Sequence, residues 1–253
     1  MSLIRTAAKP IARALLPGMQ RLARMYVERE AELDWVKALR SDPSRRNERP
    51  LEYSFAFRKI SELYPQSILD VGTGQTAWPH VLSTCGFHVT AIDNRRDYWT
   101  ADYWNRHWHV LDDNILDPAI DKKFDVITCL SVLEHIKDHD RAMKNLFGLL
   151  APGGHILLTC PYNRTKYYAD VYKEPHIAET KSYVFICQLF SESEVDRWLT
   201  SNGGKLAGAE YYRVFEGKLW REGKTLHPPV RVDADDGGHL ACLDIVKKRD
   251  GES

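Results

Sequence analysis

The chain has 253 residues, 43% of them hydrophobic, which suits one large folded domain and excludes a disordered chain. Lys and Arg total 35, as do Asp and Glu, so the formal net charge is zero. This balance lacks the basic excess of nucleic-acid-binding proteins, and we expect no nucleic-acid partner. The five cysteines form no C-x-x-C pair, which favours reduced thiols in a cytoplasmic protein over disulfides or a zinc site.

The segment from Met1 to Val27 is basic and amphipathic. It contains five basic residues, no acid and apolar residues near helical spacing, interrupted at Pro17-Gly18. Three interpretations stay open: an arm packed on its own domain or on a homodimer partner, a peripheral membrane contact, or a targeting sequence. We expect a helical arm and linker over 1–50 and a main domain over 51–248, with no membrane-spanning run.

The elements of the main domain alternate between helices and strands. Helices are expected over 51–63, 76–85, 138–150 and 191–201, after one over 28–40, and strands over 67–71, 87–93, 108–111, 124–130, 155–160, 206–215 and 240–247. Ser191 and Glu194 form a capping box, and Asn202-Gly203-Gly204 ends the last helix. Apolar strands joined by helices predict an α/β fold with a parallel sheet covered on both faces.

Two segments interrupt this alternation, 161–189 and 216–238. We interpret both as insertions at strand ends, where long connections are often functional.

The first strand, "SILDV", leads into the turn "GTGQTAW". Gly72 and Gly74 allow the backbone to approach a ligand closely, where a Cβ would collide. Ligands of open parallel sheets bind at the carboxyl ends of the strands, so this turn is the expected site. By itself the pattern suits dinucleotides and other adenosine ligands equally.

Acidic residues follow three successive strands. Asp70 precedes the glycine turn, where it would pair with a cation but repel a pyrophosphate. Asp93 ends the second strand, where a carboxylate suits ribose hydroxyls. Asp113 and Asn114 follow the third strand, where an adenine edge would lie. An amine, a ribose and an adenine together indicate S-adenosylmethionine.

Five motifs in this order resemble those of class I S-adenosylmethionine-dependent methyltransferases. They are "ILDVGTG", "VTAID", "LDDNILD", "FDVITCLSVLEHI" and "LLAPGGHILLT", between residues 67 and 161. The resemblance implies a Rossmann-like, mostly parallel sheet of seven strands with helices on both faces and an antiparallel last strand. It also implies a set of cofactor-binding residues: Asp70, Gly72, Thr73, Gly74, Asp93, Asn94, Asp113, Asn114, Ile115 and Leu130.

The stretch "CLSVLEH" is similar to that of ubiquinone-biosynthesis-type O-methyltransferases. Those enzymes carry an extra acid, implicated in metal binding, where this chain has Ser131, so we expect no metal site. His135 is the candidate catalytic base, with Glu134 beside it, because imidazole titrates near neutrality. The alternatives are that His135 only shapes the pocket and that Glu134 caps the next helix.

The methyl acceptor is expected to meet the insertions. Candidate substrate-binding residues there are Tyr162, Tyr167, Tyr168 and His176, and the alternative is that the tyrosines only pack against the core. Tyr53 and Arg58 are weaker cavity-facing candidates.

The sequence thus predicts an S-adenosylmethionine-dependent enzyme that O-methylates a small molecule or a glycan or lipid-linked precursor. The alternatives are an NAD-dependent oxidoreductase on a similar fold and a non-catalytic S-adenosylmethionine-binding module.

Overall fold

The computed structural model describes residues 47–94, 105–175, 177 and 185–249, together with residues 18, 19, 22 and 25. The chain divides into two compact units, 1–47 and 48–253. In the first unit, residues 18, 19, 22 and 25 are helical, and Met19, Leu22 and Met25 are exposed. Most of the expected arm and linker, and the expected helix over 28–40, therefore lie outside the described residues.

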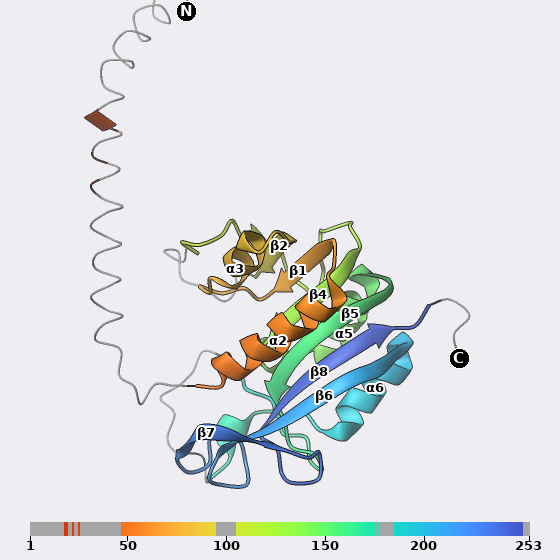
Figure 1. Cartoon of the computed structure of the whole chain (residues 1–253). Coiled ribbons are helices and arrows are strands. Elements are labelled where there is room, and N and C mark those ends of the chain that lie inside the picture. Colours follow the sequence, from red (N-terminus) through yellow and green to blue (C-terminus); the bar gives the residue numbers. More distant parts are fainter. Residues whose placement is uncertain are drawn as a thin grey trace, which may run out of the picture. The chain divides into compact units, whose positions relative to one another are not determined.

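The second unit is built on one eight-stranded sheet (Figure 1). Its strands are β1 (Ser67–Val71), β2 (His88–Asp93), β3 (Leu111–Asp112), β4 (Phe124–Leu130), β5 (Leu150–Pro161), β6 (Gly204–Phe215), β7 (Thr225–Val232) and β8 (Leu240–Lys247). The strand order is β3-β2-β1-β4-β5-β8-β6-β7. Strands β3, β2, β1, β4 and β5 are mutually parallel, whereas β8 is antiparallel to both β5 and β6, and β7 is antiparallel to β6.

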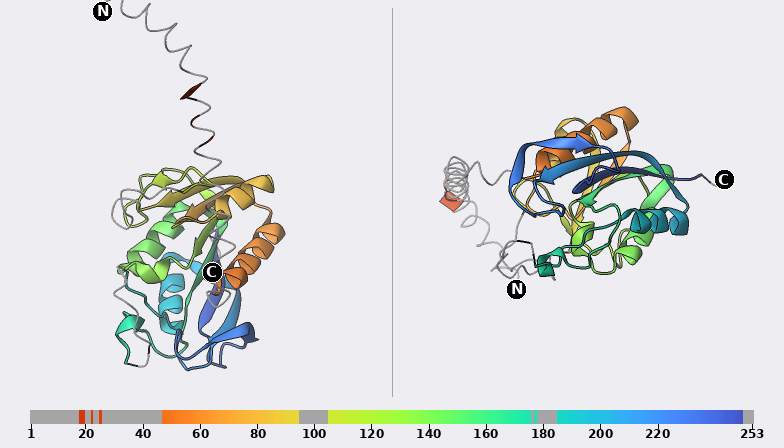
Figure 2. Two further views of the ribbon diagram at one scale, coloured as in Figure 1. Left: turned by 90° about the vertical axis from the view of Figure 1, so that its left-hand side faces the viewer. Right: turned by 90° about the horizontal axis from the view of Figure 1, so that it is seen from below.

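Helices cover both faces of this sheet (Figure 2). They are α2 (Arg49–Leu63), α3 (Trp78–Thr84), α5 (His139–Leu149) and α6 (Glu192–Asn202), with the short 3-10 turns η2 (Leu133–His135) and η3 (Val171–Lys173). Ile68 of β1 packs with Phe55 of α2 in one buried cluster, whereas Leu69 packs with Met143 of α5 and Trp198 of α6 in the other. This alternation along one strand confirms a sheet buried on both faces.

The expected mostly parallel α/β sheet is confirmed, and so is the antiparallel last strand, but the number of strands is eight instead of seven. The extra strand, β7, comes from the segment 216–238 and folds back on β6 as a hairpin. The expected third strand over 108–111 is reduced to Leu111–Asp112. Its early part is held in a turn because the Asn105 side chain accepts hydrogen bonds from the amides of His107 and Trp108.

The helix boundaries follow local capping. Helix α2 begins at Arg49, two residues before the expected start, with Pro50 in its first turn. Helix α6 has the predicted capping box, since the Glu194 carboxylate accepts the Ser191 N–H at 3.0 Å, and it ends at Gly203 in the left-handed conformation. Within the residues described, no helix is long and apolar enough to cross a membrane.

Candidate active site

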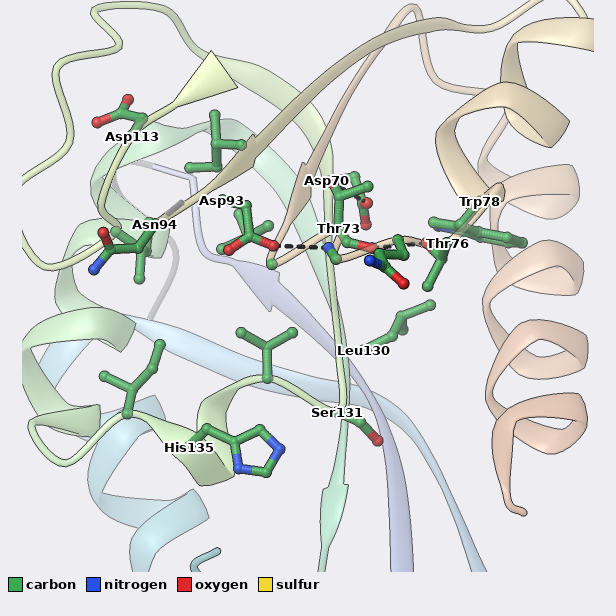
Figure 3. A pocket seen from close by; sticks show the side chains of 18 of the residues that line it. Asp70, Thr73, Thr76, Trp78, Asp93, Asn94, Asp113, Leu130, Ser131 and His135 are labelled. Carbon is green, nitrogen blue, oxygen red and sulfur yellow. Dashed lines mark hydrogen bonds between the residues drawn. The ribbon is translucent and has the colours of Figure 1, made fainter. Parts of the chain in front are cut away.

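A cavity of about 650 Å³ opens where β1, β2 and β4 end (Figure 3). Strand β1 lies between β2 and β4, so the turns that follow these strands meet at one edge of the sheet, where ligands of such sheets bind. All ten predicted cofactor-binding residues line this cavity, as does His135. The cavity is also lined by residues that the motifs did not indicate, among them Arg49, Thr76, Trp78, Val132 and Phe185.

The turn after β1 requires its glycines. Gly72 and Gly74 have φ values of 73° and 56°, in the left-handed region that glycine adopts at no steric cost. A Cβ on Gly72 would lie 2.5 Å from both Cγ atoms of Val132, in the turn after β4. The glycine turn and the "LSVLEH" segment are therefore in direct contact.

Asp70 stabilises this turn through hydrogen bonds. It is buried, and its two carboxylate oxygens accept hydrogen bonds from the hydroxyls of Thr73 and Thr128, each at 2.7 Å. Burial raises the pKa of Asp70 to about 6, against the opposing effect of these two hydrogen bonds. Through these hydrogen bonds Asp70 orders the turn.

Asp93 joins the end of β2 to the same turn. Its Oδ2 accepts the Gly74 N–H at 2.7 Å, a contact drawn in Figure 3. Asn105 supports the turn from the other side, because its Nδ2 donates to the carbonyls of Gly74 and Thr76 at 2.9 and 3.0 Å. Asn105 lies in no recognisable motif, so no sequence pattern indicated its role.

The loop after β3 is shaped by its own polar side chains. The Asp113 carboxylate accepts the backbone N–H groups of Asn114, Ala119 and Ile120 at 2.9, 3.0 and 3.2 Å. Asn114 Oδ1 accepts the Leu116 N–H at 2.9 Å. These bonds place Asp113 and Asn114 at the cavity together with the buried Ile115.

The turn after β4 is tied to α2 by a buried carboxylate. Glu52 Oε1 accepts the hydroxyls of Ser131 and Thr159, the latter at 2.8 Å, and Glu52 Oε2 lies 3.1 Å from Arg49 Nη1. Arg49 Nη1 also donates to the Leu130 carbonyl at 3.0 Å. Glu52 and Arg49 were not predicted; the one signal is an acid among the apolar residues of "RPLEYSF".

His135 lies in η2 with its ring at the cavity (Figure 3). Its Nδ1 is 2.7 Å from the Ile186 carbonyl oxygen, which can only accept, so Nδ1 carries the proton. In the neutral ring Nε2 then bears the lone pair. Burial lowers the pKa of His135, which favours this neutral form.

Glu134 points into the protein instead of into the cavity. It is buried, its Oε2 has no hydrogen-bond partner among the described residues, and its Oε1 lies 3.9 Å from His135 Nε2. Burial raises the pKa of Glu134 to about 8. It does not cap α5, because Asp138 does so by accepting the Arg141 N–H at 3.2 Å. Among the described residues, no group of three or more His, Cys, Asp or Glu is placed to hold a metal ion.

The predicted substrate tyrosines are not brought to this cavity. Tyr162 is buried against Tyr211, with ring centroids 5.1 Å apart, and Tyr168 pairs through its backbone with Leu189. Tyr167 is half-buried and packs against the core, and its hydroxyl donates a hydrogen bond to the Gln188 side chain. The contacts of these three tyrosines are those expected if they pack against the core instead of binding a substrate.

Two further expectations concern the segments around the cavity. His176 lies outside the described residues, and Phe185 is the described lining residue that comes from the region of the insertion. Of the two weaker candidates, Tyr53 lines the cavity, whereas Arg58 pairs with Glu210 at 2.7 Å.

A family model described as a methyltransferase domain matches residues 35–206. The ubiquinone biosynthesis O-methyltransferase of Rickettsia felis is 32% identical over 126 residues, 46% of this chain and 51% of that protein. The protein of the same name from Coxiella burnetii is 26% identical over 173 residues, 62% of this chain and 70% of that protein. The chain thus spans about half the length of the first of these relatives.

Among solved structures, the 1,6-didemethyltoxoflavin-N1-methyltransferase of Burkholderia thailandensis was solved with bound S-adenosylhomocysteine. It matches 91% of this chain and 90% of its own, with a TM-score of 0.52 and 12% sequence identity. At this identity the likeness concerns the fold alone.

The fold and the glycine turn flanked by Asp70 and Asp93 define the class of S-adenosylmethionine-dependent methyltransferases. The chain belongs to the methyltransferase-domain family, and its cavity is lined by all ten residues expected to bind S-adenosylmethionine. The family match sets aside the NAD-dependent oxidoreductase.

Proposed function

We propose that this methyltransferase transfers the methyl group to an oxygen atom of a small-molecule acceptor, with His135 as the general base. The observation that carries the proposal is the 2.7 Å contact between His135 Nδ1 and the Ile186 carbonyl, which leaves Nε2 as the proton-accepting nitrogen of a ring at the cavity. The names of the two curated relatives, both O-methyltransferases, support the choice of oxygen.

The cofactor is proposed to lie along the turns that end β1, β2 and β3. The Gly72–Gly74 turn, with Thr73, would contact its methionine part, and Asp93 with Asn94 would hold the ribose. The adenine is assigned to the loop after β3, with Asp113 or Asn114 at its edge and Ile115 against its ring. Leu130 would lie beside the sulfur.

Arg49 extends this assignment beyond the predicted residues. It is the one Lys or Arg among the described residues that line the cavity, and the cofactor carries a carboxylate at its methionine end. Its Nη1 contacts the Leu130 carbonyl and the Glu52 carboxylate. Because Arg binds carboxylates through paired hydrogen bonds, we assign the cofactor carboxylate to Arg49.

The proposed mechanism needs alignment and removal of one proton. The bound cofactor supplies a methyl group already activated on a sulfonium. The protein aligns the acceptor hydroxyl with that methyl group in an in-line arrangement. The acceptor oxygen would bond to the methyl carbon as the bond from that carbon to sulfur breaks, which leaves S-adenosylhomocysteine as a neutral thioether. Nε2 of His135 would take the proton that the oxygen loses. The neutral imidazole needed for this step is favoured because burial lowers the pKa of His135.

A substitution at His135 tests this proposal. We expect His135→Gln to lower methyl transfer about 100-fold or more, with unchanged affinity for S-adenosylhomocysteine, because the ring acts as a base instead of a cofactor ligand. The measurement is transfer of labelled methyl groups from S-adenosylmethionine to panels of phenols, alcohols and amines. The exposed His88 provides the control variant His88→Gln. Equal activity of both variants on an oxygen acceptor, or transfer to amines only, would contradict the proposal.

We further propose that residues 1–27 contact an anionic membrane surface, which would suit a lipid-linked acceptor. The support is the run of five basic residues without an acid. Deletion of residues 1–27 should reduce binding to vesicles that contain phosphatidylserine and leave cofactor affinity intact. Unchanged vesicle binding would refute this assignment.

A further inference from the structure

The turn that carries His135 is held by residues of one neighbouring segment, 185–190. The Ile186 carbonyl accepts the proton of Nδ1 at 2.7 Å. Two residues further on, Gln188 contacts the main chain on both sides of His135. Its Nε2 donates to the Ile136 carbonyl at 2.8 Å and to the Glu134 carbonyl at 3.3 Å. Its backbone N–H donates to the Glu134 carbonyl as well, at 2.9 Å.

The side-chain amide of Gln188 has only one orientation that fits these contacts. Gln188 is 1% exposed, so its polar atoms depend on protein partners. The reversed orientation would place the amide oxygen against the two carbonyl oxygens of Glu134 and Ile136, which cannot donate. The orientation observed supplies two N–H groups to these two carbonyls.

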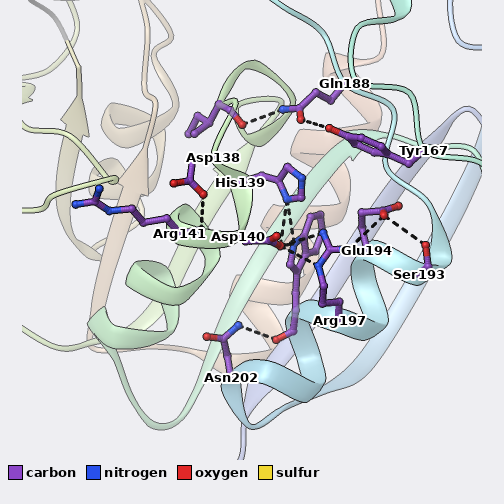
Figure 4. Close-up of polar contacts among 12 residues, drawn as sticks. Asp138, His139, Asp140, Arg141, Tyr167, Gln188, Ser193, Glu194, Arg197 and Asn202 are labelled. Atoms are coloured by element: carbon purple, nitrogen blue, oxygen red, sulfur yellow. Dashed lines mark hydrogen bonds and ion pairs between the residues drawn. The ribbon is translucent and has the colours of Figure 1, made fainter.

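Tyr167 fixes the remaining atom of this amide (Figure 4). Its hydroxyl donates to Gln188 Oε1 at 2.5 Å, and its ring stacks on Phe190 with centroids 6.2 Å apart. Burial raises the pKa of Tyr167, so the hydroxyl stays protonated and remains a donor. Tyr167, a predicted substrate-binding residue, is thus linked to the His135 turn through the side chain of Gln188.

The segment that holds His135 is itself attached to the sheet. Leu189 and Tyr168 exchange backbone hydrogen bonds at 3.0 Å each, and the Phe190 N–H donates to the Pro161 carbonyl at 3.1 Å, at the end of β5. The chain of contacts therefore runs from the sheet, through Gln188, to the turn at His135.

We propose that Gln188 is a positioning residue of the active site, which holds the His135 turn so that Nδ1 meets the Ile186 carbonyl and Nε2 faces the acceptor. Tyr167 acts one step further out, by orienting the Gln188 amide. This inference rests on the proposed role of His135 as base. It assigns to Tyr167 a positioning function in place of the predicted contact with the substrate.

Gln188 is uncharged, so its replacement leaves the charges around the imidazole unaltered. The titratable and charged groups near the ring are Glu134 on the same turn and, from other elements, Arg49 of α2 and Arg221 of the β6–β7 connection. A change in the tautomer or the pKa of His135 would then report a change in geometry.

The test is nitrogen NMR of the full chain labelled with ¹⁵N-histidine and saturated with S-adenosylhomocysteine. The chain has ten histidines, and the His135 signals are assigned by their loss in His135→Gln. In the wild type we expect a single neutral tautomer with the proton on Nδ1. In Gln188→Leu both nitrogen signals should move towards a mixture of tautomers, while the affinity for S-adenosylhomocysteine stays within about twofold.

Tyr167→Phe is the second variant, and it tests the positioning role even if Gln188→Leu does not fold. It removes one hydroxyl and leaves both carbonyl contacts of Gln188, so the signals should shift in the same direction by a smaller amount. The exposed Gln66 provides the control Gln66→Leu, which should shift nothing. Wild-type His135 signals in folded Gln188→Leu or Tyr167→Phe would overturn the positioning role. A wild-type ring protonated on Nε2 would instead overturn the base role of His135, and the inference with it.

Discussion

Ser131 donates a hydrogen bond to the carboxylate of Glu52, a residue 79 positions earlier in the chain. Ser131 follows β4 and Glu52 belongs to α2, so the bond fastens the helix before the first strand to the turn that ends in His135. Ser131 has a φ of 52°, a conformation that residues other than glycine rarely adopt. The serine therefore accepts a local strain that the hydrogen bond to a buried carboxylate offsets.

Two substitutions at Ser131 should separate the strain from the hydrogen bond. Ser131→Ala loses the bond to Glu52 and keeps the strained backbone, so we expect a loss of about 2 kcal/mol in the free energy of unfolding. Ser131→Gly loses the same bond but relieves the strain, so its loss should be about 1 kcal/mol smaller. Urea unfolding of the two variants measures the difference. Equal losses would contradict the assigned strain.

Among the acidic residues at the cavity, we expect substitution of Asp93 to weaken cofactor binding most. Its carboxylate holds the Gly74 N–H and is assigned to the ribose, so Asp93→Ala should weaken binding of S-adenosylhomocysteine about 10-fold or more. Asp93→Asn keeps an acceptor for the Gly74 N–H, so its affinity for S-adenosylhomocysteine should lie between those of the wild type and Asp93→Ala. Calorimetry gives the affinities, with the exposed Asp117→Ala as control. Normal affinity in Asp93→Ala would refute the ribose assignment.

The contact between Gly72 and Val132 predicts a coupled pair of substitutions. Gly72→Ala adds a Cβ that meets the Val132 side chain at 2.5 Å on a backbone with a φ of 73°. We expect a loss of about 2 kcal/mol or more in the free energy of unfolding, together with weaker cofactor binding.

Val132→Ala removes the two methyl groups involved, so the double variant should recover about 1 kcal/mol relative to the sum of the single losses. Unfolding of all four proteins in urea completes this cycle. If the losses in the free energy of unfolding were strictly additive, the predicted coupling between Gly72 and Val132 would be refuted.

Glu134 predicts a pH-dependent gain in stability when its charge is removed. In the unfolded chain this carboxyl ionises near its ordinary pKa of 4.5, whereas in the folded protein its pKa is about 8. Between these values the folded state binds the proton more tightly, so this group makes the wild type less stable as the pH rises from 4.5 to 8. Glu134→Gln removes this penalty.

The variant should therefore match the wild type near pH 5 and exceed it by about 3 kcal/mol near pH 8. Urea unfolding at the two pH values measures the difference, and Glu216→Gln, at an exposed glutamate, is the control. A difference that does not depend on pH would show that Glu134 is ionised in the folded protein.

The parts of the site that the sequence predicted are those built from contiguous residues. The glycine turn and Asp93 can be read from short motifs, because each is fixed by the end of one strand. Glu52 and Gln188 escaped prediction because their roles depend on contacts far along the chain: Glu52 reaches Thr159, 107 residues away, and Gln188 reaches Ile136, 52 residues away. No local pattern encodes where α2 crosses the sheet or where the segment 185–190 returns.

The tyrosines show the opposite difficulty. Their composition suggested a binding surface, but an aromatic ring that packs in a core and one that lines a cavity look alike in a sequence. The structure places Tyr162 in the core and packs the half-buried Tyr167 against it, and it makes the hydroxyl of Tyr167 a hydrogen-bond donor to Gln188. Strand β7 was missed for a related reason: Pro228 and Pro229 argue against a strand, and they are tolerated because β7 lies at the edge of the sheet.

The same two prolines determine what the edge of the sheet can do. They lie where the register between β6 and β7 shifts, in the interval between the pairs Arg213–Val230 and Phe215–Thr225. Proline has no N–H, and successive residues of a strand direct their N–H groups to opposite sides. A strand from another molecule that approached β7 would therefore find a donor missing in its middle. At the opposite edge, β3 offers only two residues. Growth of the sheet by strand addition is therefore disfavoured at both ends, and two copies that associate would have to meet through surfaces other than the sheet edges.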